Sequence, residues 1–312
     1  MSINLYDRRG KGGLPPVDIN PRFHDPALYF PDQGLINAVN VALGINQPLL
    51  VTGEPGSGKT QLAYHLAHRF ELGTPFVFNT QTDSIVRDLF YWYDTLGHLQ
   101  YAQSQREFLN PEEVEQRFIR YQALGAAIRL DRRCVVLIDE IDKAPRDLSN
   151  NILAALESME FQVSEIGKTY RAAPENYPVV IFTSNSERNL PDAFLRRLVF
   201  YHIPFPSDES LMEILAARVD GFSGDEMKLM ITHFSSLRDS RTIKIAKPPG
   251  VAELLNWAII LKKMAFPIYK LEDTRSLDAG EMRLLRSSYS LLIKNARDLA
   301  AINQLTFNLT QR

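Results

Sequence analysis

The feature that most constrains the fold is a glycine-rich segment of eight residues, 53–60, with the sequence GEPGSGKT. It follows a short apolar run at 49–52 and precedes a stretch of helical character at 61–70. The segment fits the pattern G-x-x-x-x-G-K-[ST] in the strand–loop–helix context that this pattern requires. Glycines let backbone N–H groups turn inward, and the start of a helix carries a partial positive charge. The segment therefore predicts a phosphate-binding loop between a buried strand and a helix.

The polar side chains of this loop have expected roles. Lys59 is expected to reach the β- and γ-phosphates of a nucleoside triphosphate, and Thr60 to bind Mg²⁺ through its hydroxyl. The alternative is a glycine-rich turn before an ordinary helix, and the flanking strand and helix argue against it. The predicted nucleotide-binding residues are Gly53, Glu54, Pro55, Gly56, Ser57, Gly58, Lys59, Thr60 and Gln61.

An acidic pair follows another apolar run. Residues 135–138 are Val-Val-Leu-Ile, and Asp139 and Glu140 come directly after them. Ligands of open α/β sheets bind at the carboxyl ends of the strands. We therefore expect Asp139 to orient Mg²⁺ by way of a water molecule, and Glu140 to polarise a water for attack on the γ-phosphate.

Short apolar runs alternate with helical patterns from about residue 35 to residue 205. The runs lie at 49–52, 76–79, 135–138, 179–183 and 200–203. Continuous apolar runs of this length are typical of strands that are buried on both faces. Strands that alternate with helices predict an α/β fold with a mainly parallel sheet, here of five strands.

The pattern changes after residue 206, where no further strand is indicated. Apolar residues at helical spacing predict helices over residues 208–219, 224–237, 250–265 and 279–303. We therefore divide the chain into three parts. These are a flexible, glycine- and charge-rich N-terminal arm at 1–20, an α/β nucleotide-binding domain at 21–206 and a smaller all-α domain at 207–312.

Composition excludes several classes of protein. Lys and Arg number 35 against 37 Asp and Glu, so the global basic charge of many nucleic-acid-binding proteins is absent. The single cysteine, Cys134, excludes an internal disulfide and a cysteine zinc cluster. No apolar run reaches the ~18 residues that a membrane helix needs, and the first residues lack the apolar region of a secretory signal. We therefore expect a cytoplasmic protein.

Together the glycine-rich loop and the acidic strand end resemble those of AAA+ ATPases, which are P-loop NTPases with an added helical lid. Residues 179–184 followed by Asn185 resemble the sensor-1 strand, and residues 190–197 resemble the segment that carries the arginine finger. The resemblance implies that Asn185 contacts the γ-phosphate or the attacking water. It also implies that Arg197 enters the site of a neighbouring subunit, that Arg196 is auxiliary, and that the five strands have the spatial order 5-1-4-3-2.

Within AAA+ the chain is similar to the MoxR family, in particular to its CoxD-like branch. The similarity is carried by residues 87–96, which resemble an insert of that group, and by residues 247–257, which resemble its lid helix. Residues 160–170 resemble the hairpin that precedes sensor 1, with a turn near Gly167. One departure is Ala252, which stands where many AAA+ proteins have a sensor-2 arginine, and Lys247 is a nearby candidate to replace it.

The resemblance implies Mg²⁺-dependent ATP hydrolysis that drives chaperone-like remodelling or maturation of a partner protein. An arginine finger that acts between subunits implies a homo-oligomer, and we expect a hexameric ring with a client protein and a von Willebrand A-type adaptor as partners. Two alternatives remain open. One is a nucleotide-dependent nucleic-acid motor or loader, which the near-neutral charge disfavours. The other is an ATP-binding switch or scaffold with negligible turnover, which the missing sensor-2 arginine allows.

Overall fold

The computed structural model describes residues 20–105, 109–186, 188–239 and 245–310. The N-terminal arm expected at residues 1–20 lies outside these ranges apart from Asn20. The chain divides into two compact units. The α/β unit comprises residues 31–53 and 58–203, and the helical unit comprises residues 1–30, 54–57 and 204–312.

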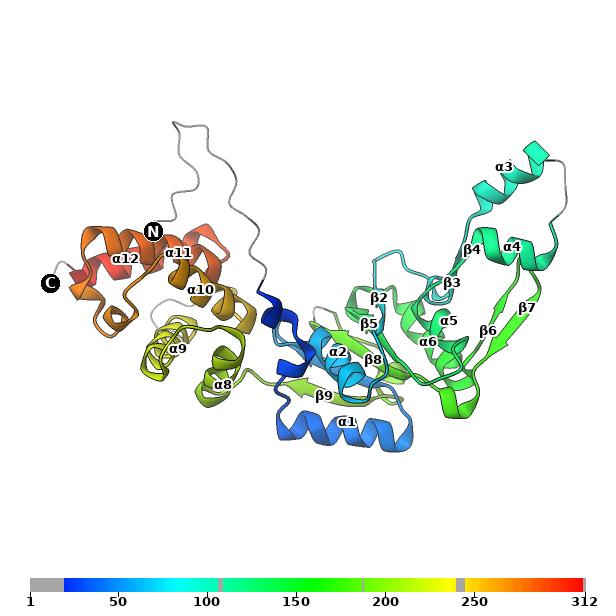
Figure 1. The fold of residues 1–312 in the computed structure, drawn as a ribbon, viewed down its shortest axis with the longest axis horizontal. Coiled ribbons are helices and arrows are strands. Elements are labelled where there is room, and N and C mark those ends of the chain that lie inside the picture. The colour runs from blue at the N-terminus through cyan, green and yellow to red at the C-terminus, as the bar shows by residue number, and fades with distance from the viewer. Residues whose placement is uncertain (1–19, 106–108, 187, 240–244, 311–312) are drawn as a thin grey trace. The chain divides into compact units, whose positions relative to one another are not determined.

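A parallel sheet of five strands forms the centre of the α/β unit (Figure 1). The strands are β1 (Leu49–Gly53), β2 (Phe76–Asn79), β5 (Val135–Asp139), β8 (Val179–Ser184) and β9 (Val199–Ile203). Their spatial order is β2-β5-β8-β1-β9, and each neighbouring pair is parallel. Read from the other edge this is the expected order 5-1-4-3-2, so the predicted fold class is confirmed.

Helices accompany this sheet in the α/β unit. They are α1 (Gln33–Ile45), α2 (Lys59–Arg69), α5 (Ala123–Ile128), α6 (Arg146–Ser158) and α7 (Asp192–Leu195), with the short 3-10 helices η3 (Val86–Leu89), η4 (Ile141–Lys143) and η5 (Pro174–Asn176). α1 contacts β1 and β9, α2 contacts β1, β5 and β8, and α5 contacts β2 and β5. Every residue of β1 is buried, as expected of a central strand whose two faces are covered by helices.

An insert and a hairpin extend from the α/β unit beyond α5 and α6 (Figure 1). The insert comprises β3 (Tyr91–Tyr93), α3 (Thr95–Gln105), α4 (Pro111–Phe118) and β4 (Ile119–Tyr121), with β3 and β4 paired antiparallel. The hairpin consists of β6 (Glu160–Val163) and β7 (Lys168–Arg171), and Gly167 in its turn has a φ of 65°. The Glu115 carboxylate on α4 accepts hydrogen bonds from Tyr121 at 2.7 Å and from Lys168 at 3.1 Å. This carboxylate therefore fastens the hairpin to the insert.

The helical unit is described here by itself. Its described residues form α8 (Asp208–Arg218), α9 (Gly224–Arg238), α10 (Val251–Lys263), α11 (Ala279–Leu292) and α12 (Ala296–Thr310), with the 3-10 helices η1 (Pro21–His24), η2 (Pro26–Leu28), η6 (Ile268–Leu271) and η7 (Thr274–Ser276). Phe234, Trp257 and Tyr289 are among the large side chains fully buried in its core. None of the helices in the described part of the chain has the length and apolar character that crossing a bilayer requires.

The single helix predicted over residues 279–303 is wrong in one respect, because two helices occupy this range. α11 ends at Leu292, and Ile293 has extended backbone angles of φ −112° and ψ 122°. The Asn295 side chain then accepts a hydrogen bond from the Asp298 N–H at 2.7 Å, which caps the start of α12. Periodicity alone did not detect this break because apolar spacing continues across it.

Candidate active site

The glycine-rich loop joins β1 to α2 through backbone that only glycine adopts easily. Gly56 has a φ of 79° and Gly58 a φ of 88°, both in the left-handed region. The Glu54 carbonyl accepts a hydrogen bond from the Ser57 N–H at 3.2 Å, which closes a tight turn. This local geometry is the one in which backbone N–H groups can turn toward a bound anion.

Lys59 is buried at the start of α2, with 6% of its surface exposed. Its ammonium donates a hydrogen bond to the Gly53 carbonyl at 2.9 Å. Because a buried ammonium is costly unless polar groups surround it, this bond stabilises the charge. The bond therefore holds the Lys59 ammonium next to Gly53, the first residue of the loop.

The two residues predicted to hold Mg²⁺ meet in the α/β unit. The Thr60 hydroxyl lies 3.1 Å from Asp139 Oδ1 and 3.2 Å from Asp139 Oδ2. Thr60 is the second residue of α2, the helix that follows β1, and Asp139 is the last residue of β5. The carboxyl ends of parallel strands share one edge of the sheet, which explains how residues far apart in sequence come together.

Thr183 is a residue of this group that sequence reasoning missed. Its hydroxyl donates to Asp139 Oδ1 and accepts from the Glu140 backbone N–H at 2.9 Å, and the residue is fully buried. It is the penultimate residue of β8, the strand next to β5 in the sheet. The signal in the sequence was a hydroxyl residue two positions before Asn185, which is too common to single out.

Glu140 adopts a left-handed backbone conformation, with φ 55° and ψ 48°. Its Oε1 atom accepts a hydrogen bond from Asn185 Nδ2 at 3.0 Å, and its Oε2 atom pairs with the Lys143 ammonium. Such a conformation costs about 1–3 kcal/mol for a residue other than glycine and is concentrated at functional sites. The structure thus brings Glu140 and Asn185 together, and it adds Lys143, which the sequence analysis did not select.

Arg197 lies at the amino-terminal ends of the strands, opposite the carboxyl ends at which Asp139 lies. It comes two residues before β9 begins, whereas Asp139 and Ser184 end their strands. A strand of five residues is about 16 Å long, so Arg197 is separated from the Thr60–Asp139 group by the length of the sheet. Arg196 is an exposed C-cap residue of α7.

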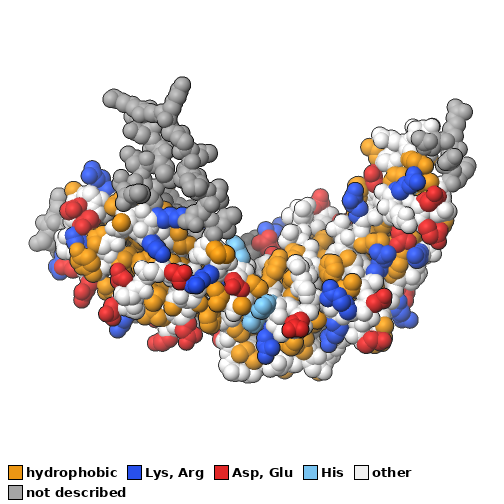
Figure 2. All heavy atoms as spheres, in the orientation of Figure 1, with side chains coloured by type: hydrophobic (Ala, Val, Ile, Leu, Met, Phe, Trp, Pro, Cys, Tyr) orange, Lys and Arg blue, Asp and Glu red, His pale blue; other side chains and the backbone are white. Residues whose placement is uncertain are grey.

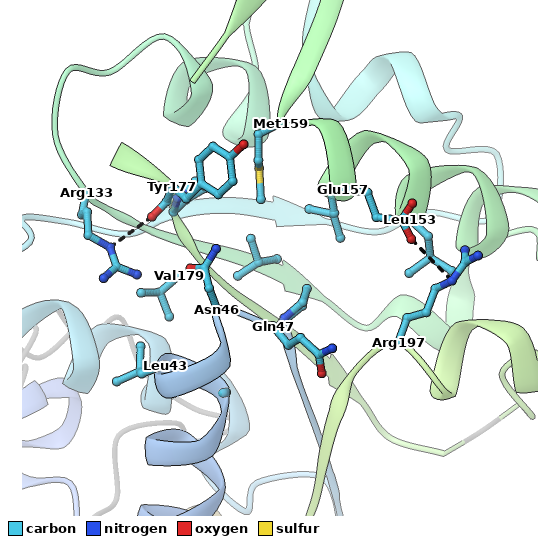
Figure 3. Close-up of a pocket in the computed structure, with 15 residues that line it drawn as sticks. Leu43, Asn46, Gln47, Arg133, Leu153, Glu157, Met159, Tyr177, Val179 and Arg197 are labelled. Atoms are coloured by element: carbon cyan, nitrogen blue, oxygen red, sulfur yellow. Dashed lines mark hydrogen bonds and ion pairs between the residues drawn. The ribbon is translucent and has the colours of Figure 1, made fainter. Parts of the chain in front are cut away.

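A cavity of about 230 Å³ includes Arg197 in its wall (Figure 3). Arg197 Nε pairs with Glu157 Oε1 of α6 at 3.5 Å, and 54% of the Arg197 side chain and 65% of the Glu157 side chain are exposed. Arg133, which donates to the Tyr177 carbonyl at 3.1 Å, lies at the other end of the cavity. Apolar side chains such as Leu153 and Val179 line the wall between the two arginines.

Two buried polar atoms near the loop test whether a nucleotide fits. Ser57 Oγ and Gln61 Oε1 are buried and have no hydrogen-bond partner among the described residues. Buried polar groups are normally paired, so these orphaned atoms fit a polar ligand in the loop. Within the described residues, no cluster of three or more His, Cys, Asp or Glu could hold a metal ion. A magnesium ion bound through the Thr60 hydroxyl and an Asp139-bound water needs no such cluster.

Residues 54–57 belong to the helical unit, and so does the position expected to carry the sensor-2 arginine. Ala252 is the second residue of α10, and a Cβ added at Gly56 would lie 3.5 Å from the Ala252 Cβ. Position 252 therefore does approach the loop, but its side chain is a methyl group. Lys247 is exposed.

Residues 48–198, just under half of the chain, match the family model described as AAA domain (dynein-related subfamily). Residues 48–198 are therefore similar to an AAA domain. The matched region includes the phosphate loop, the acidic strand end and Arg197.

Solved structures that resemble the chain share little sequence with it. They include a point mutant of RuvB from Thermotoga maritima (14% identity, 82% of this chain and 74% of that chain covered, TM-score 0.43). They also include the AAA domain of FIGL-1 in complex with ADP (16% identity, 88% of this chain and 84% of that chain covered, TM-score 0.44). A third is a putative ATPase from Cytophaga hutchinsonii (15% identity, 88% of this chain and 87% of that chain covered, TM-score 0.39). No curated protein matches the chain.

Proposed function

We propose that this chain hydrolyses ATP with Mg²⁺, as a homo-oligomer, and uses the reaction to remodel a partner protein. The observation that carries the proposal is the cluster of polar side chains at the carboxyl ends of the strands. There the Thr60 hydroxyl contacts Asp139, and Asn185 contacts Glu140 at 3.0 Å. Hydrolysis of a phosphoanhydride needs a metal site and a carboxylate that orients water, and this edge supplies groups for both.

Each residue of the group has a proposed task. Lys59 binds phosphate oxygens, and Thr60 and Asp139 hold Mg²⁺, directly and through water. Bound Mg²⁺ would neutralise negative charge on the phosphate oxygens. Glu140 accepts the proton of the attacking water, and Asn185 holds Glu140 or that water in place.

The position of Arg197 supports an oligomer. Because Arg197 precedes β9 while the Thr60–Asp139 group follows the strands, the length of the sheet separates the finger from the phosphate loop of its own chain. An arginine suits transition-state stabilisation because its charge is permanent and its planar fork matches phosphate oxygens. We therefore propose that Arg197, assisted by Arg196, acts on the nucleotide of a neighbouring copy, and that the copies form a hexameric ring of the MoxR type.

The partner is proposed to be a protein, reached through a von Willebrand A-type adaptor. Figure 2 shows acidic and basic side chains interspersed on the visible face. On this face, interspersed charge disfavours the continuous basic surface that a nucleic-acid motor uses to contact phosphates. The hairpin β6–β7 and the insert around α3 are the proposed contact surfaces for a client protein.

The decisive experiment compares ATP turnover of the wild type with that of Glu140→Gln. The wild type is expected to turn over at least about 100-fold faster, since a general base contributes this much or more. Equal rates would overturn the proposal and favour an ATP-binding switch. The same variant, loaded with Mg-ATP, should retain the client protein in a pull-down, and salt-sensitive retention of DNA or RNA instead would favour a nucleic-acid motor.

A further inference from the structure

The tip of the phosphate loop is held by an arginine of the helical unit. Arg238, the last residue of α9, donates from Nη2 to the Glu54 carboxylate at 2.7 Å. The Arg238 side chain is only 8% exposed, whereas the Glu54 side chain is 47% exposed. The buried partner of this ion pair is therefore the cation, and the more exposed partner belongs to the loop.

Two further contacts fix the Arg238 guanidinium. Its Nη1 donates to the Pro249 carbonyl at 2.7 Å, and its central carbon lies 3.6 Å from the centroid of the Phe205 ring. Phe205 in turn stacks on Phe234 in the core of the helical unit. A guanidinium with so little exposure must keep its polar partners, because an uncompensated buried charge is strongly unfavourable. The orientation of Arg238 is thus set by the helical unit, and Glu54 is positioned by Arg238.

The start of α10 approaches the same turn. A Cβ added at Gly250 would lie 2.8 Å from the Pro55 carbonyl oxygen, which is closer than real Cβ contacts come. Gly250 is therefore required for this approach. Residues 54–57 are held by the end of α9 through charge and by the start of α10 through close packing.

We propose that Arg238 is a positioning residue that couples the helical unit to the phosphate loop through Glu54, without touching the nucleotide. The Glu54 carbonyl accepts from the Ser57 N–H, so fixing Glu54 fixes the turn whose N–H groups are proposed to face the phosphates. This inference rests on the proposed function, because it assumes that the loop binds nucleotide phosphates. Its consequence is that the helical unit affects nucleotide affinity through this ion pair.

A double-mutant cycle tests the coupling. Affinities for ADP and for the non-hydrolysable analogue AMP-PNP, each with Mg²⁺, are measured by calorimetry for the wild type, Glu54→Gln, Arg238→Gln and the double variant. Each single variant is expected to bind about fivefold more weakly, and the double variant no more weakly than the weaker single variant. Additive effects, or affinities equal to that of the wild type, would overturn the inference.

Two further variants separate coupling from general damage. Gly250→Ala carries no change of charge and is expected to weaken nucleotide binding, because its Cβ displaces the turn at Pro55. Lys270→Gln removes an ion pair of the helical unit, the one with Glu281 at 2.6 Å, and is expected to bind nucleotide within about twofold of the wild type. Equal weakening by Lys270→Gln and Arg238→Gln would show a loss of folding rather than of coupling.

The inference and the proposed function fail in different ways. A wild type that binds AMP-PNP but turns over no faster than Glu140→Gln contradicts ATP hydrolysis and leaves the binding cycle valid. Urea unfolding of the nucleotide-free variants provides the complementary measurement. The effects of the two substitutions could be non-additive in the free energy of unfolding and leave nucleotide affinity unchanged. That result would show that the ion pair is only a structural contact, and it would overturn the proposed coupling.

Discussion

Asn185 Nδ2 donates to Glu140 Oε1 at 3.0 Å, and the two residues directly follow the neighbouring strands β8 and β5. The register of this strand pair therefore sets the distance between the amide and the carboxylate. A left-handed backbone at Glu140 turns the chain at this point, where a regular strand would otherwise continue. The arrangement gives the carboxylate one defined partner at the edge where the Thr60–Asp139 group lies.

We predict that Asn185→Ala lowers kcat for ATP about 10- to 100-fold with little change in KM. The reason is that Asn185 orients Glu140, which acts in the chemical step, while the phosphates are bound by other residues. Steady-state kinetics check this. In the Glu140→Gln background the same substitution should have no further effect, and a further large loss would contradict the shared role.

Thr183→Val is predicted to reduce the free energy of unfolding by about 1–3 kcal/mol. The substitution removes a buried hydroxyl that donates to Asp139 and accepts from the Glu140 N–H at 2.9 Å, so both partners lose a bond. Urea unfolding measures the loss. Thr183→Ser keeps the hydroxyl and is the matched control, and an equally destabilised serine variant would attribute the effect to packing instead.

Arg197→Ala subunits are predicted to regain activity when mixed with Glu140→Gln subunits. Each variant lacks one half of a site, and a mixed oligomer contains interfaces at which an intact Arg197 faces an intact Glu140. ATP turnover is measured over a range of mixing ratios. If no ratio exceeds the sum of the separate variants, Arg197 does not act between subunits.

We predict that His233, in the helical unit, makes the free energy of unfolding fall at acid pH. Burial lowers the pKa of His233 to about 4, and the ring packs near-parallel to those of Trp257 and Tyr289, with Nε2 2.8 Å from the Tyr289 hydroxyl. Above pH 6.5 the imidazole is neutral in both the folded and the unfolded chain. Between pH 6.5 and pH 4 it is protonated only in the unfolded chain, so stability falls as the pH falls, by about 3 kcal/mol in all.

Urea unfolding at pH 7.0 and pH 4.5 measures this loss. Carboxylates also titrate in this range, so the relevant quantity is the difference between the wild type and His233→Gln. The glutamine variant should lose less stability on acidification, because it lacks the group that protonates on unfolding. Equal losses in the two proteins would show that His233 does not contribute.

Much of the candidate site could be predicted because its signals are local. The loop at 53–60 needs left-handed backbone at Gly56 and Gly58, and the glycines at these two positions indicate this directly in the sequence. The acidic pair at the end of 135–138 is recognisable for a similar reason, since four apolar residues predict the strand that presents it. By contrast Thr183 contacts Asp139 across 44 positions of sequence, and only the pairing of β5 with β8 reveals it.

The amino-acid sequence by itself determined the five strands, the phosphate loop and the residue types at the edge of the sheet. These follow from backbone conformation and hydrophobic periodicity over a few neighbouring residues. Only the tertiary structure decided the contact of Thr183 with Asp139 and the contact of Arg238 with Glu54, 184 residues away. The physical reason is that ion pairs and buried hydroxyls depend on which surfaces pack together, and packing is a property of the folded chain as a whole.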